Sequence, residues 1–80
     1  MKTEFKGLLV RKLKNKGIIG AAHKPEENFL RFVKKHHDRR SILSDYEELI
    51  RDGVIVRQKK NKGIHVSLTK NKKLYVQYLN

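Results

Sequence analysis

The 80-residue chain is expected to fold as a single α+β domain over residues 1–80, with helices first and a β-hairpin after them. Apolar residues recur at helical spacing in three stretches of residues 3–52, and they alternate with polar residues between positions 64 and 68. Glycines and the single proline fall between these stretches, where helices and turns begin or end. A chain of this length buries one modest core, so a function on its surface or in a shallow cleft is expected.

The first helix is predicted over residues 3–14, whose leucines and Phe5 lie on one helical face while most of its cations lie on the other. Gly17 is a suitable residue to end this helix. Residues 17–23 are small and apolar around two isoleucines, and they are too few for a full element. A short extended link is expected there.

A second helix is predicted to begin at Pro25 and to end near Lys35. Proline suits the first turn of a helix, and the two glutamates that follow it favour the positive end of the helix dipole. A third helix is predicted over about residues 40–52, where four apolar residues share one face. Gly53 is placed to end it in a left-handed conformation.

A β-hairpin is predicted next, with residues 54–57 paired to residues 64–68 and the turn at residues 61–63. Four cations crowd the end of this hairpin with no acidic residue beside them: Arg57, Lys59, Lys60 and Lys62. A cationic loop of this kind suits the backbone of a polyanion better than it suits a core or a small-molecule pocket.

Residues 70–79 fit two interpretations. Thr69 suits the N-cap of a short final helix. Leu74, Val76 and Tyr78 also alternate as they would on a strand. The helix is the favoured interpretation.

The net charge of +12 and the pI near 10.3 indicate a domain that meets phosphates, although basic proteins of membrane surfaces share this balance. The charge is uneven along the chain. Residues 1–24 carry seven cations and one acid, residues 54–80 carry seven cations and no acid, and residues 25–53 carry six cations and seven acids. The positive potential therefore comes from the two ends of the sequence.

The absence of cysteine excludes a disulfide framework and a thiolate zinc site. The first apolar run, residues 8–10, stops at Arg11 and is too short for a signal peptide or a membrane span. A cytoplasmic protein with no membrane partner is expected.

No cofactor, no metal ion and no enzymatic activity are expected. His36, His37 and Asp38 are adjacent, and neighbouring histidines at a helix end are expected to point in different directions. The sequence also lacks paired carboxylates, a Ser/His/Asp arrangement and a phosphate-binding loop.

The order of helix, short extended link, two helices and basic hairpin resembles the winged helix-turn-helix DNA-binding domains. The resemblance covers most of the chain in element order and residues 40–70 in detail. It is carried by Ile42, Tyr46, Leu49, Arg51, Asp52, Gly53, Val54 and Ile55, and by Ser67, Leu68, Thr69 and Lys70. Two features depart from the family pattern: Asn71 stands where many relatives place a glycine, and the third helix carries Asp45, Glu47, Glu48 and Asp52.

This resemblance implies sequence-specific binding of double-stranded DNA by a small transcriptional regulator. The third helix would enter the major groove with its N-terminal part nearest the bases, and the hairpin, or wing, would contact phosphates. Glu48 and Asp52 are expected to face away from DNA or to pair with nearby cations. The candidate DNA-binding residues are Arg39, Arg40, Ser41, Leu43, Ser44 and Glu47 on the helix, and Arg57, Lys59, Lys60 and Lys62 on the hairpin.

An alternative partner class remains open at this stage. The acidic third helix suits a basic protein partner, so an RNA-associated module or a replication or assembly module with the same fold is the second hypothesis. Relatives of this architecture often form homodimers through the first and last helices, which makes Phe5, Leu9, Tyr75 and Leu79 the candidate interface residues.

Overall fold

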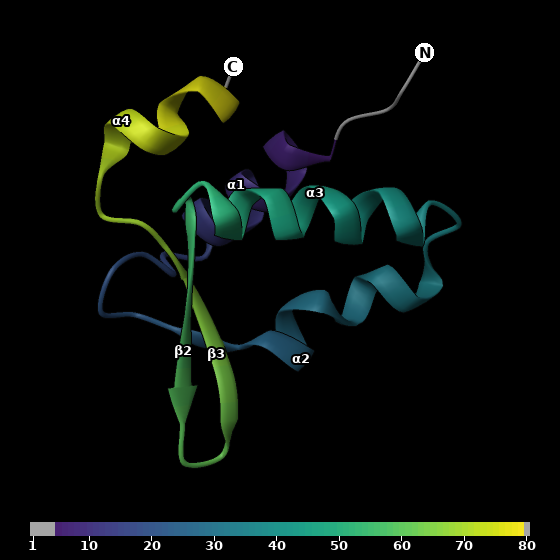
Figure 1. Ribbon diagram of the computed structural model, residues 1–80, viewed down its shortest axis with the longest axis horizontal. Helices are drawn as coiled ribbons and strands as arrows, with labels where there is room; N and C mark the ends of the chain where they lie inside the picture. The colour runs from purple at the N-terminus through teal and green to yellow at the C-terminus, as the bar shows by residue number, and fades with distance from the viewer. Residues whose placement is uncertain (1–4, 80) are drawn as a thin grey trace.

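The computed structural model describes residues 5–79. Residues 3 and 4 of the predicted first helix lie outside this range. The elements in chain order are α1 (Lys6–Asn15), β1 (Lys24–Pro25), α2 (Glu26–Phe29) with the 3-10 helix η1 (Leu30–Lys35), α3 (Arg39–Arg51), β2 (Ile55–Lys60), β3 (Gly63–Leu68), and α4 (Lys72–Tyr75) with the 3-10 helix η2 (Val76–Tyr78). The fold is α+β, with the helices gathered at one end of an antiparallel sheet (Figure 1).

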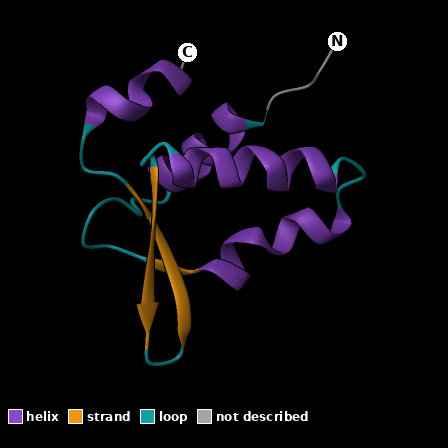
Figure 2. Cartoon of the chain, viewed as in Figure 1, coloured by secondary structure: helices purple, strands orange, loops and turns teal. Residues whose placement is uncertain are grey.

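The sheet has three strands in the order β1-β3-β2, one more than the sequence predicted. In the hairpin, Ile55 pairs with Leu68 at the base and Lys60 with Gly63 at the tip (Figure 2). The added strand β1 pairs antiparallel with β3, and its two residues were too few to show a strand pattern. Pro25 cannot donate a backbone hydrogen bond, which suits the edge position of this strand.

The link before β1 is tied to the sheet. The backbone N–H of Leu68 donates to the carbonyl of Ile18 over 2.8 Å, and the N–H of Gly20 donates to the carbonyl of Leu68 over 2.9 Å. Gly20 has φ +66°, a left-handed conformation that favours glycine, and the side chain of Lys70 lies over it. The extended link predicted for residues 17–23 is therefore anchored at the base of β3.

The hydrophobic core lies between α1, α3 and the base of the hairpin, and the last helical segment closes it. Its most deeply buried apolar side chains are Leu9, Val10, Leu13, Ile42, Leu49, Val54, Ile55, Val66, Leu68 and Tyr75. The periodic apolar positions of the first and third predicted helices all belong to this cluster or pack against it.

The chain after the hairpin is helical over Lys72–Tyr78, and the strand interpretation of this segment is wrong. Its N-cap is Asn71, not Thr69. The side-chain oxygen of Asn71 accepts the N–H of Lys73, while Thr69 Oγ1 accepts the N–H of Asn71. Thr69 thus orders the turn that leads into the helix.

The proposed dimer contacts need correction. Phe5, Leu9 and Tyr75 are buried in the core of a single chain, and Leu79 packs against that core half-buried. The last helical segment folds back over α1, where Arg11 donates a hydrogen bond to the carbonyl of Tyr78. These apolar faces already cover one another, so they are not available to a second copy.

The N-terminal end of α1 is held to α3 by two polar contacts. The buried carboxylate of Asp45 accepts the backbone N–H of Phe5 over 2.6 Å. One turn further along α3, Glu48 pairs with the ammonium of Lys6 at 3.0 Å, and this hydrogen bond raises the pKa of Lys6. A buried carboxylate is costly without such partners, so these contacts fix which face of α3 is turned to α1.

No helix within residues 5–79 combines the length and the apolar character that a bilayer crossing requires.

Replacement of Asp45 by alanine should lower the free energy of unfolding by about 1.5–3 kcal/mol, because it removes a buried hydrogen bond to a charged group. Urea unfolding followed by circular dichroism measures the change. Asp52→Ala on the same helix is the control, since the exposed Asp52 makes only a 4.0 Å contact with Arg51 and its loss should cost less than about 0.5 kcal/mol. Equal unfolding curves for the two variants would contradict the assignment.

Candidate nucleic-acid interface

One side of α3 is open to solvent, and we call it the outward face of α3. Its exposed side chains are Arg39, Arg40, Leu43, Ser44 and Glu47, and Arg51 follows at the C-terminal end of the helix. Spacings of four residues within this set place the side chains on one helical surface. Ser41, also predicted from the sequence, is only half exposed at its edge. The structure thus brings together all six residues predicted on this helix.

Two of the three acids of α3 are absent from the outward face, and Asp52 lies just beyond the helix at its C-cap. Asp45 is buried against Phe5, and Glu48 pairs chiefly with Lys6 on α1 and more distantly with Arg51. The expectation that Glu48 pairs with nearby cations is confirmed, and Lys6 is a partner that the sequence did not indicate. Glu47 and Asp52 remain exposed. The first half of the outward face therefore carries two arginines and no exposed carboxylate.

The β2–β3 tip extends beyond the other elements (Figure 1). Its three exposed lysines, Lys59, Lys60 and Lys62, are called the tip lysines. With Asn61, His23 and His65 they line an open hollow of about 420 Å³ that contains no carboxylate. Among the residues that the structure describes, no tip lysine takes part in an ion pair. The tip is a concentrated positive surface, as the sequence predicted.

Arg57 differs from the other cations of the hairpin. Its guanidinium forms a two-pronged contact with Glu26, with Nε 3.0 Å from Oε2 and a terminal nitrogen 3.2 Å from Oε1. The hydroxyl of Tyr46 donates to the same carboxylate. Burial and this bond to Glu26 raise the pKa of the Tyr46 hydroxyl. Arg57 therefore joins the hairpin through Glu26 to α2 and to Tyr46 of α3. Its side chain is 44% exposed, and its contact with phosphate stays a prediction.

Two histidines meet beside the tip. The Nδ1 atoms of His23 and His65 are 2.7 Å apart, and the two rings meet edge to face at 4.7 Å between centroids. Such a contact requires one nitrogen to donate and the other to accept, so it needs at least one of the facing nitrogens unprotonated. Desolvation, followed by the charges of His23 and Lys60, lowers the pKa of His65. No local pattern predicts this pair, because its members are separated by 42 positions.

The turn before α3 holds a second histidine group. The rings of His36 and His37 stack with centroids 4.9 Å apart, so the expectation that they point in different directions is wrong. One ligand atom from each of His36, His37 and Asp38 lies within 4.8 Å of the others. His36 Nδ1 already accepts the N–H of Asp38, and its ring packs against Phe5. The hydrogen bond at Nδ1 leaves Nε2 as the ring nitrogen of His36 that could ligate a metal.

Comparisons of the chain with protein-family models, with curated proteins and with solved structures find no match.

Stability should depend on pH through the His23–His65 contact. Because the pKa of His65 is lowered in the folded state, the unfolded chain takes up a proton more readily as the pH falls below about 6.5. The stabilising effect should be complete above that pH and decrease below it. Thermal unfolding between neutral and mildly acidic pH measures the decrease. His65→Gln and His23→Gln should each reduce this loss of stability at acidic pH. If both variants lose as much stability as the natural protein, the histidine pair is not the cause of the loss.

Proposed function

We propose that this chain is a winged helix-turn-helix protein that binds double-stranded DNA. The observation that carries the proposal is the outward face of α3, from which Asp45 and Glu48 are turned away. The element order and the β1-β3-β2 sheet support the same assignment. In this proposal α3 enters the major groove, while the β2–β3 tip, as the wing, lies against phosphates.

The residues of α3 would divide the contacts according to their chemistry. Arg39 and Arg40, near the N-terminal end, suit phosphate or the acceptor pair of a guanine. The hydroxyls of Ser41 and Ser44 can donate to or accept from base edges, and Leu43 offers an apolar surface to a thymine methyl group. In the middle of the exposed surface, Glu47 can accept from a cytosine amino group and would repel phosphate.

The tip lysines supply the second part of the proposed interface. Flexible ammonium groups position a protein on the DNA backbone without reading its sequence. The pairing of Arg57 with Glu26 leaves this task chiefly to Lys59, Lys60 and Lys62. The base of the hairpin is held by Glu26, whereas the tip lysines have no acidic partners. The tip lysines would therefore be able to adjust to the path of the DNA backbone.

A small transcriptional regulator of the cytoplasm is the cellular role that fits this proposal. It needs no cofactor and no catalytic group. A homodimer remains part of the proposal, on a surface other than the core residues named above. Leu74 and Val76, which are 37% and 51% exposed, offer apolar side chains on the last helical segment.

Affinity for duplex DNA should fall steeply with salt. If about six phosphates are neutralised, log affinity should decrease with log salt at a slope of roughly −5. Fluorescence anisotropy of a labelled duplex at a series of salt concentrations measures this slope. An affinity that is nearly independent of salt would contradict the proposal.

Changing the three tip lysines together to alanine should weaken binding about equally for different duplex sequences, because the tip contacts phosphate. It should also make the salt slope shallower by roughly 2–3, since each lost phosphate contact reduces the slope by about 1. The matched control changes Lys70, Lys72 and Lys73 to alanine, which removes the same charge from exposed positions near the last helix. A sequence-selective loss in the tip variant, or an equal loss in the control, would remove the tip from its proposed role.

The alternative hypothesis, an RNA-associated or assembly module, was based on the acids of the third helix, which would suit a basic protein partner. Since two of them face α1, that support is reduced to Glu47 and Asp52. Competition at equal salt separates the two partners. Duplex DNA should displace structured RNA from the protein, and the reverse order would favour the RNA partner.

A further inference from the structure

A second basic surface lies away from the wing, in a hollow between α1 and the α2–η1 segment. The hollow has a volume of about 350 Å³. We call it the α1–η1 hollow, and it is lined by Lys12, Lys16, Lys24, Asn28, Phe29, Arg31, Phe32 and Lys35. Three separate parts of the chain thus converge on one depression that holds five cations and no carboxylate.

The cations of the hollow have no acidic partners in the structure. Among residues 5–79, none of the five takes part in an ion pair. The nearest acids along the chain are Glu26, which is bound to Tyr46 and Arg57, and Glu27, which does not line the hollow. Like charges gathered without counter-charges repel one another, and an anionic ligand would relieve that repulsion.

Contacts within the hollow hold several of these groups in place. The ammonium of Lys12 lies over the ring of Phe32 at 4.5 Å from its centroid, and Arg31 donates to the side-chain oxygen of Asn28 over 3.0 Å. Lys16 and Lys24 approach closely enough that contact with Lys16 is the largest cause of the lowered pKa of Lys24. Lys12 and Arg31 are therefore held by neighbours at the hollow, and Lys16, Arg31 and Lys35 line it from exposed positions.

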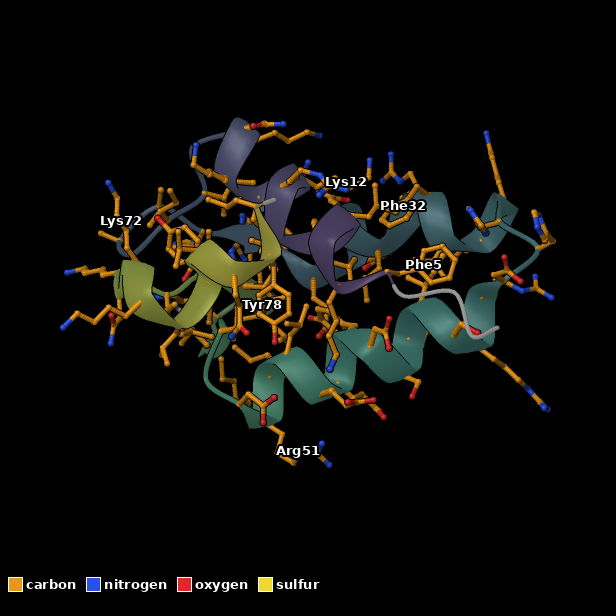
Figure 3. All side chains as sticks on the ribbon, turned by 90° about the horizontal axis from the view of Figure 1, so that it is seen from above. Phe5, Lys12, Phe32, Arg51, Lys72 and Tyr78 are labelled. Atoms are coloured by element: carbon orange, nitrogen blue, oxygen red, sulfur yellow. The ribbon has the colours of Figure 1, made fainter. Side chains whose placement is uncertain are left out.

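The α1–η1 hollow lies on a different side of the molecule from α3. Viewed from above, Lys12 and Phe32 lie across the molecule from Arg51 at the end of α3 (Figure 3). The molecule measures 38 × 28 × 21 Å, whereas the persistence length of duplex DNA is about 150 bp. A stiff duplex that lies along the outward face of α3 would not turn round the protein to reach the hollow.

We propose that the α1–η1 hollow is a second binding site for a nucleic-acid phosphate backbone, so that one protein chain holds two separate duplexes. The site is separate from the α3 and wing surface, and the count of two duplexes rests on the proposed function of that surface. The cluster of lysines and arginine would contact successive phosphates of one strand. Because the contacts are to phosphate, this site would not select a base sequence.

Binding stoichiometry tests the second site. The protein is titrated with a duplex of about 10 bp, roughly one helical turn, so that one duplex cannot cover both surfaces. Sedimentation velocity at low salt then measures the number of duplexes bound per chain. A second measurement uses donor-labelled and acceptor-labelled duplexes, between which energy transfer requires that both be held together.

Three variants with the same loss of charge are compared. The hollow variant carries Lys16→Gln, Arg31→Gln and Lys35→Gln, all at exposed positions. The tip variant changes the three tip lysines to glutamine, and the control variant changes Lys70, Lys72 and Lys73 to glutamine. Circular dichroism and thermal unfolding confirm that each variant is folded.

The natural protein and the control variant should each bind two duplexes and give energy transfer. The hollow variant should bind one duplex through the α3 and wing surface, and its energy transfer should fall about tenfold or more. A natural protein that binds one duplex, with that binding lost in the tip variant and kept in the hollow variant, would overturn the second site. A hollow variant that still joins two duplexes would also overturn it and would assign the joining to a dimer. If the tip variant instead keeps full binding while the hollow variant binds no duplex, the hollow stands and the proposed role of α3 and the wing fails.

Discussion

The contact between the N-terminal end of α1 and one face of α3 determines how the rest of the molecule is arranged. A buried carboxylate needs hydrogen-bond donors, and the backbone N–H of Phe5 donates to Asp45. The ammonium of Lys6 pairs with the partly exposed Glu48. These contacts fix the rotation of α3 about its axis. As a result the helix turns two acids towards α1 and presents its arginines, serines and Leu43 to solvent. α3 carries three arginines and three acids, and of these acids only Glu47 remains on its outward face.

A second polar group joins the hairpin to the helices. Glu26 at the start of α2 accepts from Tyr46 on α3 and pairs with Arg57 on β2, so one carboxylate connects three elements. This contact fixes the base of the hairpin and leaves the tip lysines beyond the other elements. The cations of the described chain thus divide into those that hold the fold together and those that gather without acidic partners. The second kind includes the tip lysines and the cations of the α1–η1 hollow, and each of these groups lines a depression without a carboxylate. A polyanion is the partner that both depressions suit.

Local patterns in the sequence account for most of the secondary structure. The helical spacing of apolar residues predicted three helical regions that the structure contains. The alternation of apolar and polar residues after Gly53 predicted the hairpin. Strand β1 was not predicted because two residues are too few for an alternating pattern. It is a strand only because it pairs with β3. The dimer residues were predicted wrongly because an amphipathic pattern indicates that a helix face is buried. The pattern does not indicate whether the face is buried in the core of the same chain or against a second copy. Long-range partners were also beyond the sequence: Glu26 lies 31 positions from Arg57, and Phe5 lies 40 from Asp45.

Amide chemical shifts of the isotope-labelled protein, recorded during titration with duplex DNA, test the central claim about α3 most directly. The account predicts shift changes along the outward face of α3 from Arg39 to Glu47 and at the tip lysines. The amide of Phe5 should retain the signature of its hydrogen bond to Asp45, because that contact positions the face before DNA arrives. Changes confined to the α1–η1 hollow and the last helix, with the outward face of α3 unaffected, would contradict the account.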